Sequence, residues 1–231
     1  QSQSVATADV DGDGDLDVLG AFLNDDKIVW YESIATTTLD ANPTFVEGGA
    51  AVVLDSDVSI TDAELDALNS GSGNYSGASV TLVRNTGTDA DDLFSFNDGN
   101  GLTLSGGNLI KNGQTIASFD TTTTAGELGV TFTDANGENP TSADVNNTLR
   151  QITYANSSDA PPALVQVDWT FDDGNTGSQG SGGALQALGS ITVSITVVND
   201  APVNTLPASI PVTEDIATAL TGISIADDDA G

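Results

Sequence analysis

Residues 9–17 read Asp-Val-Asp-Gly-Asp-Gly-Asp-Leu-Asp, and they constrain the fold more than any other stretch of the chain. Carboxylates at alternate places with a glycine at the sixth match the first half of a calcium loop. In such a loop, side-chain oxygens bind from places one, three and five, a backbone carbonyl from place seven and a further ligand from place nine. The predicted ligands are therefore the side chains of Asp9, Asp11, Asp13 and Asp17 and the carbonyl of Asp15.

The flanks of this loop differ from those of a helical calcium motif. An EF-hand continues into an amphipathic helix and has a glutamate at place twelve, where this chain has Gly20. Residues 4–8 and 18–23 are short and rich in apolar residues, which is typical of strands. The sequence therefore predicts a calcium loop between two strands.

This stretch resembles a known repeat. Residues 4–33, with VATADVDGDGDLDVLGAF and the later strand KIVWY, resemble one integrin-type FG-GAP (VCBS-like) repeat, the blade unit of calcium-binding β-propellers. We assign residues 1–35 to a partial repeat of this kind. Because one blade leaves its sheet uncovered, we expect the chain to begin inside a longer polypeptide.

Charge limits the partners that the chain can have. Its 231 residues carry 34 Asp and Glu against 4 Lys and Arg, a formal net charge of -30. A nucleic-acid binder needs a basic face, so this class is excluded, and docking on anionic lipid is disfavoured. No apolar run approaches the roughly 18 residues of a membrane span, so no membrane insertion is expected. Divalent cations are the expected partners.

The missing residue types limit the chemistry. The chain has no His and no Cys, which removes the usual general base, zinc thiolate sites and any Ser-His-Asp triad. Acidic pairs at the spacing of glycosidase carboxylates will occur by chance in so acidic a chain, and nearly all the acids fall in turn or metal contexts. We therefore expect no enzymatic activity.

Residue usage favours an all-β fold with many turns. Val, Ile, Thr, Gly, Ser and Asn dominate, and no long helical periodicity is present. Short helices are expected after the capping sequence Thr61-Asp62-Ala63-Glu64 and from Thr141 to Arg150. The Asn112-Gly113 pair predicts a hairpin. The predicted strands cover residues 50–54, 78–84, 92–96, 102–105, 108–111, 114–119, 128–133, 165–171 and 191–197. A long Gly/Ser-rich loop is expected over residues 172–189.

An internal repeat links the middle of the chain to its last part. Phe45-Val46-Glu47 and the later Val58-Ser59-Ile60-Thr61-Asp62 correspond to Val212-Thr213-Glu214 and Ile223-Ser224-Ile225-Ala226-Asp227. Both copies have an apolar-X-Glu opening, an apolar strand and a Ser-Ile-X-Asp sequence. We therefore assign residues 36–43 to a linker, residues 44–200 to one module and residues 201–231 to the start of another.

A second resemblance covers most of the chain. Residues 44–203, with VEGGAAVVLDSDVSITDAELDAL, LRQITYANSS, WTFDDGN and VNDAPV, resemble the cadherin-like tandem modules of large bacterial surface adhesins. The resemblance implies an immunoglobulin/cadherin-like β-sandwich with short helices and long loops, flanked by partial β modules, with calcium at the junctions. The implied ligands of the later junction are Asn199, Asp200, Glu214, Asp227 and Asp229. Those of the earlier junction are Asp40, Glu47 and Asp62.

These features lead to two functional hypotheses. The first is a non-catalytic calcium-binding segment of an extracellular adhesin or surface filament, in which calcium rigidifies tandem modules for adhesion or self-association. Calcium sites of extracellular modules have dissociation constants of about 10⁻⁴ to 10⁻³ M. The alternative is a carbohydrate-binding module that holds a surface polysaccharide on exposed aromatic residues. The candidates for that role are Trp30, Tyr31, Tyr75, Tyr154 and Trp169, although Trp30 and Trp169 lie in alternating strands and are expected in a core.

Overall fold

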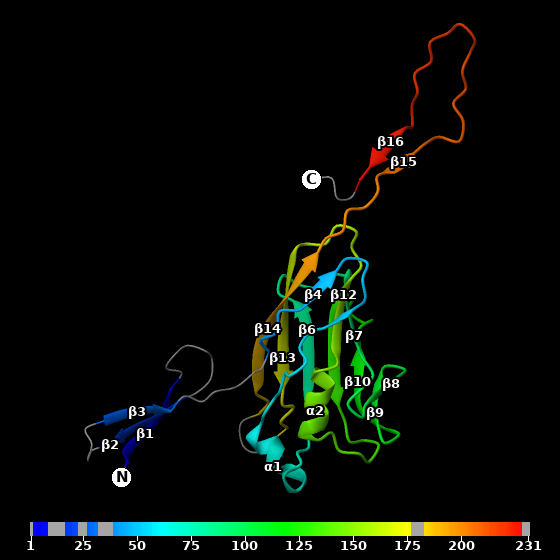
Figure 1. The fold of residues 1–231 in the computed structure, drawn as a ribbon. Helices are drawn as coiled ribbons and strands as arrows, with labels where there is room; N and C mark the ends of the chain where they lie inside the picture. Colours follow the sequence, from blue (N-terminus) through cyan, green and yellow to red (C-terminus); the bar gives the residue numbers. More distant parts are fainter. Residues whose placement is uncertain (1, 9–16, 23–26, 32–38, 177–182, 228–231) are drawn as a thin grey trace.

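The computed structural model describes residues 2–8, 17–22, 27–31, 39–176 and 183–227. The first three ranges form an antiparallel sheet of strands β1 (Ser2–Ala8), β2 (Asp17–Phe22) and β3 (Lys27–Tyr31), in that order (Figure 1). The strands predicted on both sides of the acidic loop are therefore confirmed. Ala8 pairs with Asp17, so the residue before the acidic segment lies opposite the last residue of that segment.

Two further sheets make up the main body of the chain (Figure 1). One has eight strands, which occur in the order β4 (Thr44–Val46), β14 (Gln186–Thr196), β13 (Leu164–Asp172), β6 (Ser79–Arg84), β11 (Glu127–Phe132), β10 (Gln114–Asp120), β9 (Asn108–Lys111) and β8 (Thr103–Ser105). The other has three, in the order β5 (Val52–Val53), β12 (Ile152–Asn156) and β7 (Asp92–Phe96). All neighbours are antiparallel except β4 and β14, which are parallel.

Apolar alternation explains how the two sheets pack on each other. Along β13, Val165, Val167, Trp169 and Phe171 are buried and the residues between them are not, as expected for strands with one face on a core. Aromatic rings join the two sheets: the Phe45 and Tyr154 ring centroids lie 6.2 Å apart, and those of Phe96 and Phe119 lie 4.9 Å apart. The all-β, sandwich-like fold predicted from the sequence is confirmed at this level.

Two short helices cover part of the sandwich, as predicted. Helix α1 (Ala63–Gly71) begins one residue later than its capping sequence suggested, because the N-cap is Asp62, not Thr61. Helix α2 (Ser142–Leu149) has Thr141 as N-cap in a complete capping box with Asp144. Neither of these helices of the described chain is long and apolar enough to cross a membrane.

Turn chemistry sets the pairing of β9 with β10. Asn112 and Gly113 both have positive φ, 51° and 79°, which is the two-residue turn that matches the twist of a hairpin. Lys111 therefore pairs with Gln114, and the predicted hairpin is confirmed.

The expected long loop after β13 is shorter than predicted. Strands β13 and β14 pair continuously as far as Asp172 opposite Gln186, so Asp172 and residues 186–189 of the predicted loop belong to a ladder. Backbone hydrogen bonding and the neighbouring strand extend β14 beyond the apolar alternation that marks it in the sequence.

The last described part of the chain is extended. β15 (Val203–Thr205) pairs antiparallel with β16 (Ser224–Ala226). The residues between them form a long excursion, drawn in orange to red in Figure 1. The side chains of both strands are exposed.

Candidate metal centres

One group of acids gathers at the end of the sandwich where three strands finish. Glu47 follows β4, Asp159 lies beyond β12 and Asp200 lies beyond β14. One carboxylate oxygen of each lies within 4.8 Å of those of the other two. We call this group the Glu47 cluster. It joins segments that are far apart in the sequence, so the fold, not local spacing, brings these residues together.

The parallel pairing of β4 with β14 positions Glu47. The Glu47 N–H donates to the Thr196 carbonyl at 3.0 Å, and Glu47 Oε2 accepts from the Val198 N–H at 2.7 Å. A tight turn follows, in which Gly48 has φ 66°. The other oxygen, Oε1, is buried and has no hydrogen-bond partner among the described residues. A buried carboxylate oxygen without a donor is costly unless a cation or water satisfies it.

Asp227 lies next to the Glu47 cluster. An open hollow is lined by Asp159, Asp200, Ala201, Val203, Ala226 and Asp227. A further carboxylate from the end of β16 therefore borders the Glu47 cluster. Asn199 contributes through its amide, which donates to the Asp200 carbonyl at 2.8 Å and braces the backbone of the cluster.

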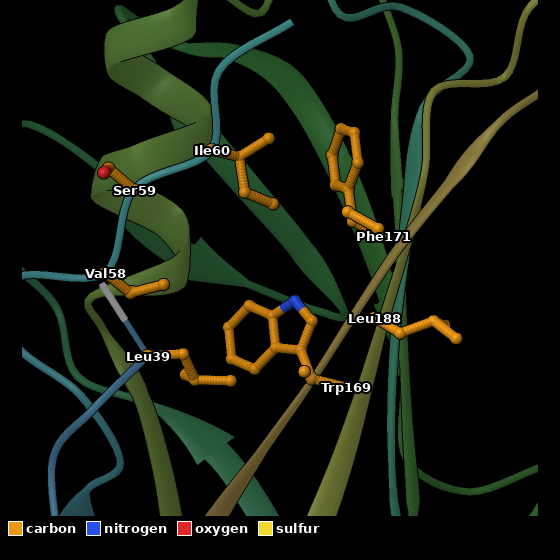
Figure 2. A pocket seen from close by; sticks show the side chains of 9 residues that line it. Leu39, Val58, Ser59, Ile60, Trp169, Phe171 and Leu188 are labelled. Atoms are coloured by element: carbon orange, nitrogen blue, oxygen red, sulfur yellow. The ribbon is translucent and has the colours of Figure 1, made fainter. Parts of the chain in front are cut away.

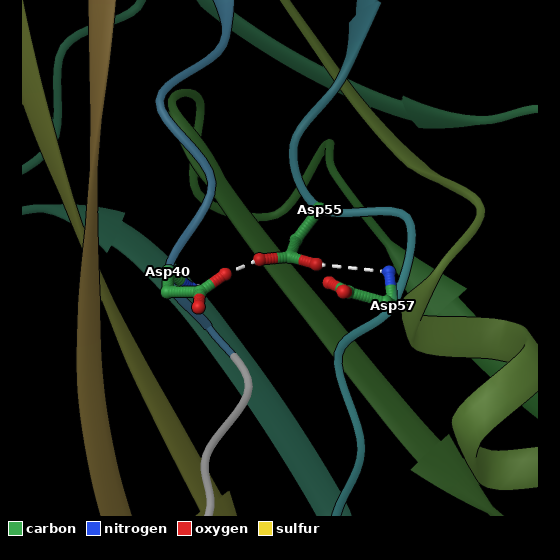
Figure 3. A group of neighbouring side chains, drawn as sticks. All are labelled: Asp40, Asp55 and Asp57. Atoms are coloured by element: carbon green, nitrogen blue, oxygen red, sulfur yellow. Dashed lines mark hydrogen bonds between the residues drawn. The ribbon is translucent and has the colours of Figure 1, made fainter.

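A second group of acids lies beside the linker that enters the sandwich (Figure 3). Asp40, Asp55 and Asp57 each have a carboxylate oxygen within 4.8 Å of the others. Asp55 is 1% exposed. Its Oδ2 accepts from the N–H groups of Asp40 and Ala41 at 3.1 and 3.2 Å, and its Oδ1 accepts from those of Asp57 and Val58 at 3.0 and 2.9 Å. We call this group the Asp55 cluster.

The electrostatics of the Asp55 cluster favour a cation. A hydrogen bond that the protonated Asp57 carboxyl donates to the Asp55 side chain, together with the charge of Asp55, raises the pKa of Asp57 above its ordinary value of 3.8, and the charge of Asp40 adds to this effect. Like charges at such separations raise a carboxyl pKa because the ionised forms repel. A divalent cation between the three carboxylates would remove this repulsion.

Three basic side chains have contacts that the structure describes. Arg84 pairs with Asp89 and Asp92 at 3.2 and 2.6 Å. Lys111 pairs with Glu138 and Asp144 at 3.4 and 2.8 Å. Arg150 donates to the carbonyl oxygens of Val58 and Asp57. Arg150 therefore lies beside the Asp55 cluster and contacts its backbone, whereas Arg84 and Lys111 bind acids outside both clusters.

The structure regroups the ligands predicted for the junctions. Glu47 was expected with Asp40 and Asp62 before the sandwich, and it lies instead with Asp159 and Asp200 after it. That expected grouping is wrong, because the parallel β4 carries Glu47 to the far end of the sheet. Asp62 has a capping role: its Oδ1 accepts from the Leu65 N–H at 2.7 Å at the start of α1.

The remaining predicted ligands divide by location. Glu214 is exposed in the excursion between β15 and β16. Asp17 begins β2, and its side chain is not among those described. The following lie outside the described residues: Asp9, Asp11, Asp13, Asp15 and Asp229.

Sequence reasoning missed three members of the clusters. Asp55 and Asp57 stand in an Asp-Ser-Asp sequence, a spacing that can place two carboxylates on one ion, and this was a usable signal. Asp159 precedes two prolines in a loop, and nothing local distinguishes it from an ordinary turn residue.

The aromatic candidates for carbohydrate binding are buried where the structure describes them. Tyr75 and Tyr154 are 0% exposed and Trp169 is 4% exposed, so the prediction that Trp169 packs in the core is confirmed. Figure 2 shows the Trp169 indole beside Leu39 and Val58. The apolar pocket there has room for about 10 Å³, which is the space of about one water molecule and not of a sugar ring.

Comparison with known proteins adds no assignment. No family model, no curated protein and no solved structure matches the chain.

Proposed function

We propose that this chain is a non-catalytic, calcium-binding segment of an extracellular adhesin or surface filament, and that calcium fixes its sandwich to the segment that follows. The sandwich would be of the immunoglobulin/cadherin-like class that residues 44–203 resemble. The acidic loop of residues 9–17 would bind a further ion in an FG-GAP-like repeat.

The observation that carries the proposal is the environment of Glu47. Its Oε1 is buried without a hydrogen-bond partner among the described residues, and carboxylate oxygens of Asp159 and Asp200 lie within 4.8 Å of one of its oxygens. Three carboxylates at this separation repel strongly unless a cation lies between them. A divalent cation from solution would satisfy the buried Oε1 and reduce this repulsion.

The ligand chemistry favours calcium. The ligand atoms that the cluster offers to a metal ion are all oxygens, and the chain has neither His nor Cys. Calcium accepts six to eight oxygen ligands in flexible geometry, whereas magnesium requires near-ideal octahedral geometry and keeps several waters. Ligands drawn from a turn, a loop and a linker suit the more tolerant ion.

The location of the cluster explains what calcium would do. Val198, which donates to Glu47, and Asp200 both belong to the stretch between β14 and β15. An ion held by Glu47, Asp159 and Asp200 would fasten this linker to two strand ends of the sandwich. Calcium would thereby stiffen the connection, and its removal would leave a hinge of repelling carboxylates.

The test is a calorimetric calcium titration of the full chain and of the Glu47→Gln variant. Glutamine keeps the shape and one carbonyl oxygen but removes the charge. We expect the variant to bind one calcium fewer, or to bind it at least tenfold more weakly. Glu64→Gln is the matched control, because Glu64 is exposed and belongs to neither cluster.

Two results would contradict the proposal. One is a titration in which Glu47→Gln and Glu64→Gln both behave as the unmodified chain does. The other is small-angle scattering that shows the same flexibility in millimolar calcium and in chelator.

A further inference from the structure

A backbone turn of the sandwich occurs a second time near the end of the chain. In the first copy, Gly48 has φ 66° and the Gly49 N–H donates to the Val46 carbonyl at 2.8 Å. In the second copy, Asp215 has φ 63° and the Ile216 N–H donates to the Thr213 carbonyl at 3.2 Å.

The two turns occupy the same place in the internal repeat. Each directly follows the glutamate of an apolar-X-Glu opening, Glu47 in one case and Glu214 in the other. A positive φ is unusual for an aspartate, so the second turn keeps the conformation of the first although it lacks the glycine. Sequence and geometry therefore repeat together.

The two copies differ in what covers their apolar side chains. Phe45, Val58 and Ile60 of the first copy are 1%, 2% and 9% exposed. The residues that correspond to them in the second copy, Val212, Ile223 and Ile225, are 70%, 48% and 71% exposed. Apolar side chains in the same pattern are thus in a core in one copy and open to solvent in the other. Such a set of exposed apolar residues indicates an interaction surface.

The first copy shows what fits against such a segment. β4 lies parallel to β14, with Thr44 beside Ser194 and Val46 beside Thr196. β5 lies antiparallel to β12, with Val52 beside Tyr154. The Phe45 ring packs on Tyr154 of β12, and Val58 and Ile60 line a small pocket with Trp169 and Phe171 of β13. The cover of the first copy is therefore supplied by β12, β13 and β14.

We infer that residues 210–226 are the first strand, turn and second strand of another sandwich, and that their apolar side chains dock on strands equivalent to β12, β13 and β14 of a module of the same type. The partner is a sequence like that of residues 152–196 whose own first strands are not in place. The intact sandwich of a second chain is a poor partner, because its β12 and β14 already pair with its own β5 and β4.

This inference assigns Glu214 to a different site from Asp200. Glu47 lies at the end of its sandwich where β14 finishes. Its equivalent Glu214 therefore belongs at the corresponding end of the second sandwich, away from Asp200. The inference depends on packing and not on calcium, and it can fail or succeed independently of the proposed function.

The test extends the full chain with its own sequence. Residues 63–200 are fused directly after Asp227 in place of residues 228–231, so that residues 212–227 stand where residues 45–62 stand in the first module. We expect the added segment to fold. The readouts are a second set of slowly exchanging amides and resistance of the added segment to protease. Adding Val212→Asp and Ile225→Asp to this fusion should abolish both signals while the first sandwich stays folded.

A control fusion makes a negative result decisive. It carries residues 44–200 in place of residues 63–200 and so brings its own first strands. If the control folds its added module and the test fusion does not, the inference is overturned. It is also overturned if the unextended chain forms dimers in which residues 210–226 become protected, because the partner would then be a second copy.

Discussion

Glu47 accepts a hydrogen bond from the backbone N–H of Val198 at 2.7 Å, across 151 residues of sequence. One oxygen of this carboxylate therefore holds the linker. The other is buried without a partner among the described residues and belongs to a side chain that meets Asp159 and Asp200. One oxygen of Glu47 thus contacts the backbone that leaves the sandwich, and the other is available to the proposed ion.

Replacing Glu47 by alanine should release the Val198 amide. A hydrogen bond to a charged group contributes about 1.5–3 kcal/mol, so the amide of Val198 should exchange at least tenfold faster in Glu47→Ala. Hydrogen exchange followed by NMR measures this directly. Glu64→Ala should leave the Val198 rate unchanged. An unchanged rate in Glu47→Ala would mean that the contact does not persist in solution.

Asp92 should be among the most sensitive positions in the core. It is 2% exposed and accepts from Arg84 Nε and Nη2 at 2.7 and 2.6 Å, from Tyr154 Oη at 2.5 Å and from Asn156 Nδ2 at 3.0 Å. Removing one partner of a buried ion pair costs about 3–5 kcal/mol. Asp92→Asn should therefore lower the free energy of unfolding by about that amount in urea denaturation. The exposed neighbour Asp91→Asn is the control and should change it by less than about 1 kcal/mol.

Two aspartates of the Asp55 cluster should respond in opposite directions when calcium is absent. Asp55→Asn should destabilise the fold, because an amide nitrogen cannot accept from two of the four backbone N–H groups that the carboxylate satisfies. Each orphaned donor costs about 1–3 kcal/mol. Asp57→Asn should stabilise it, because it removes a charge that Asp55 repels.

The sign of the Asp57 effect follows from linkage. Its pKa is raised in the folded state, so its contribution is favourable below the ordinary pKa of 3.8 and is lost as the pH rises through the folded value. At neutral pH in chelator the ionised group therefore opposes folding. Thermal unfolding of both variants in chelator checks this, and a shift of the same sign for both would refute the assignment.

Local patterns in the sequence predicted the elements but not the grouping of the acids. Alternation identified β7, β13 and the centre of β14, and the Asn-Gly pair identified the β9–β10 hairpin, because these signals act within a few residues. β12 was not predicted as a strand of its own: Ile152, Thr153 and Tyr154 are all buried, so its sequence does not alternate. Glu47 lies beside Asp159 and Asp200 because β4 pairs in parallel with β14, and no local signal encodes that pairing.

Alkaline titration should separate the buried tyrosines from ordinary ones. Burial raises the pKa values of Tyr75 and Tyr154 well above 10, and hydrogen bonds to Asp66 and Asp92 raise them further. Their contributions to stability are therefore complete below pH 10 and are lost as the pH rises above it. Tyrosinate absorbance from these two residues should appear only together with loss of the circular dichroism signal. Ionisation that precedes unfolding and disappears in Tyr154→Phe would contradict the packing of Tyr154.

Trp169 offers a reporter that distinguishes calcium binding from carbohydrate binding. The chain has two tryptophans, so Trp30→Phe leaves only Trp169. Its indole is covered by Leu39 and Val58, which are the direct neighbours of Asp40 and Asp57 in the Asp55 cluster. An ion that draws these carboxylates together should move both covering residues.

In the Trp30→Phe chain, calcium should therefore shift the Trp169 emission, and a soluble polysaccharide in chelator should not, because the pocket admits about one water molecule. Adding Asp57→Asn should abolish the calcium response, whereas adding the control Glu64→Gln should preserve it. A response to polysaccharide that survives Asp57→Asn would favour the carbohydrate-binding alternative. The absence of a calcium response would remove the Asp55 cluster from the set of ion sites and leave the Glu47 cluster as the one to examine.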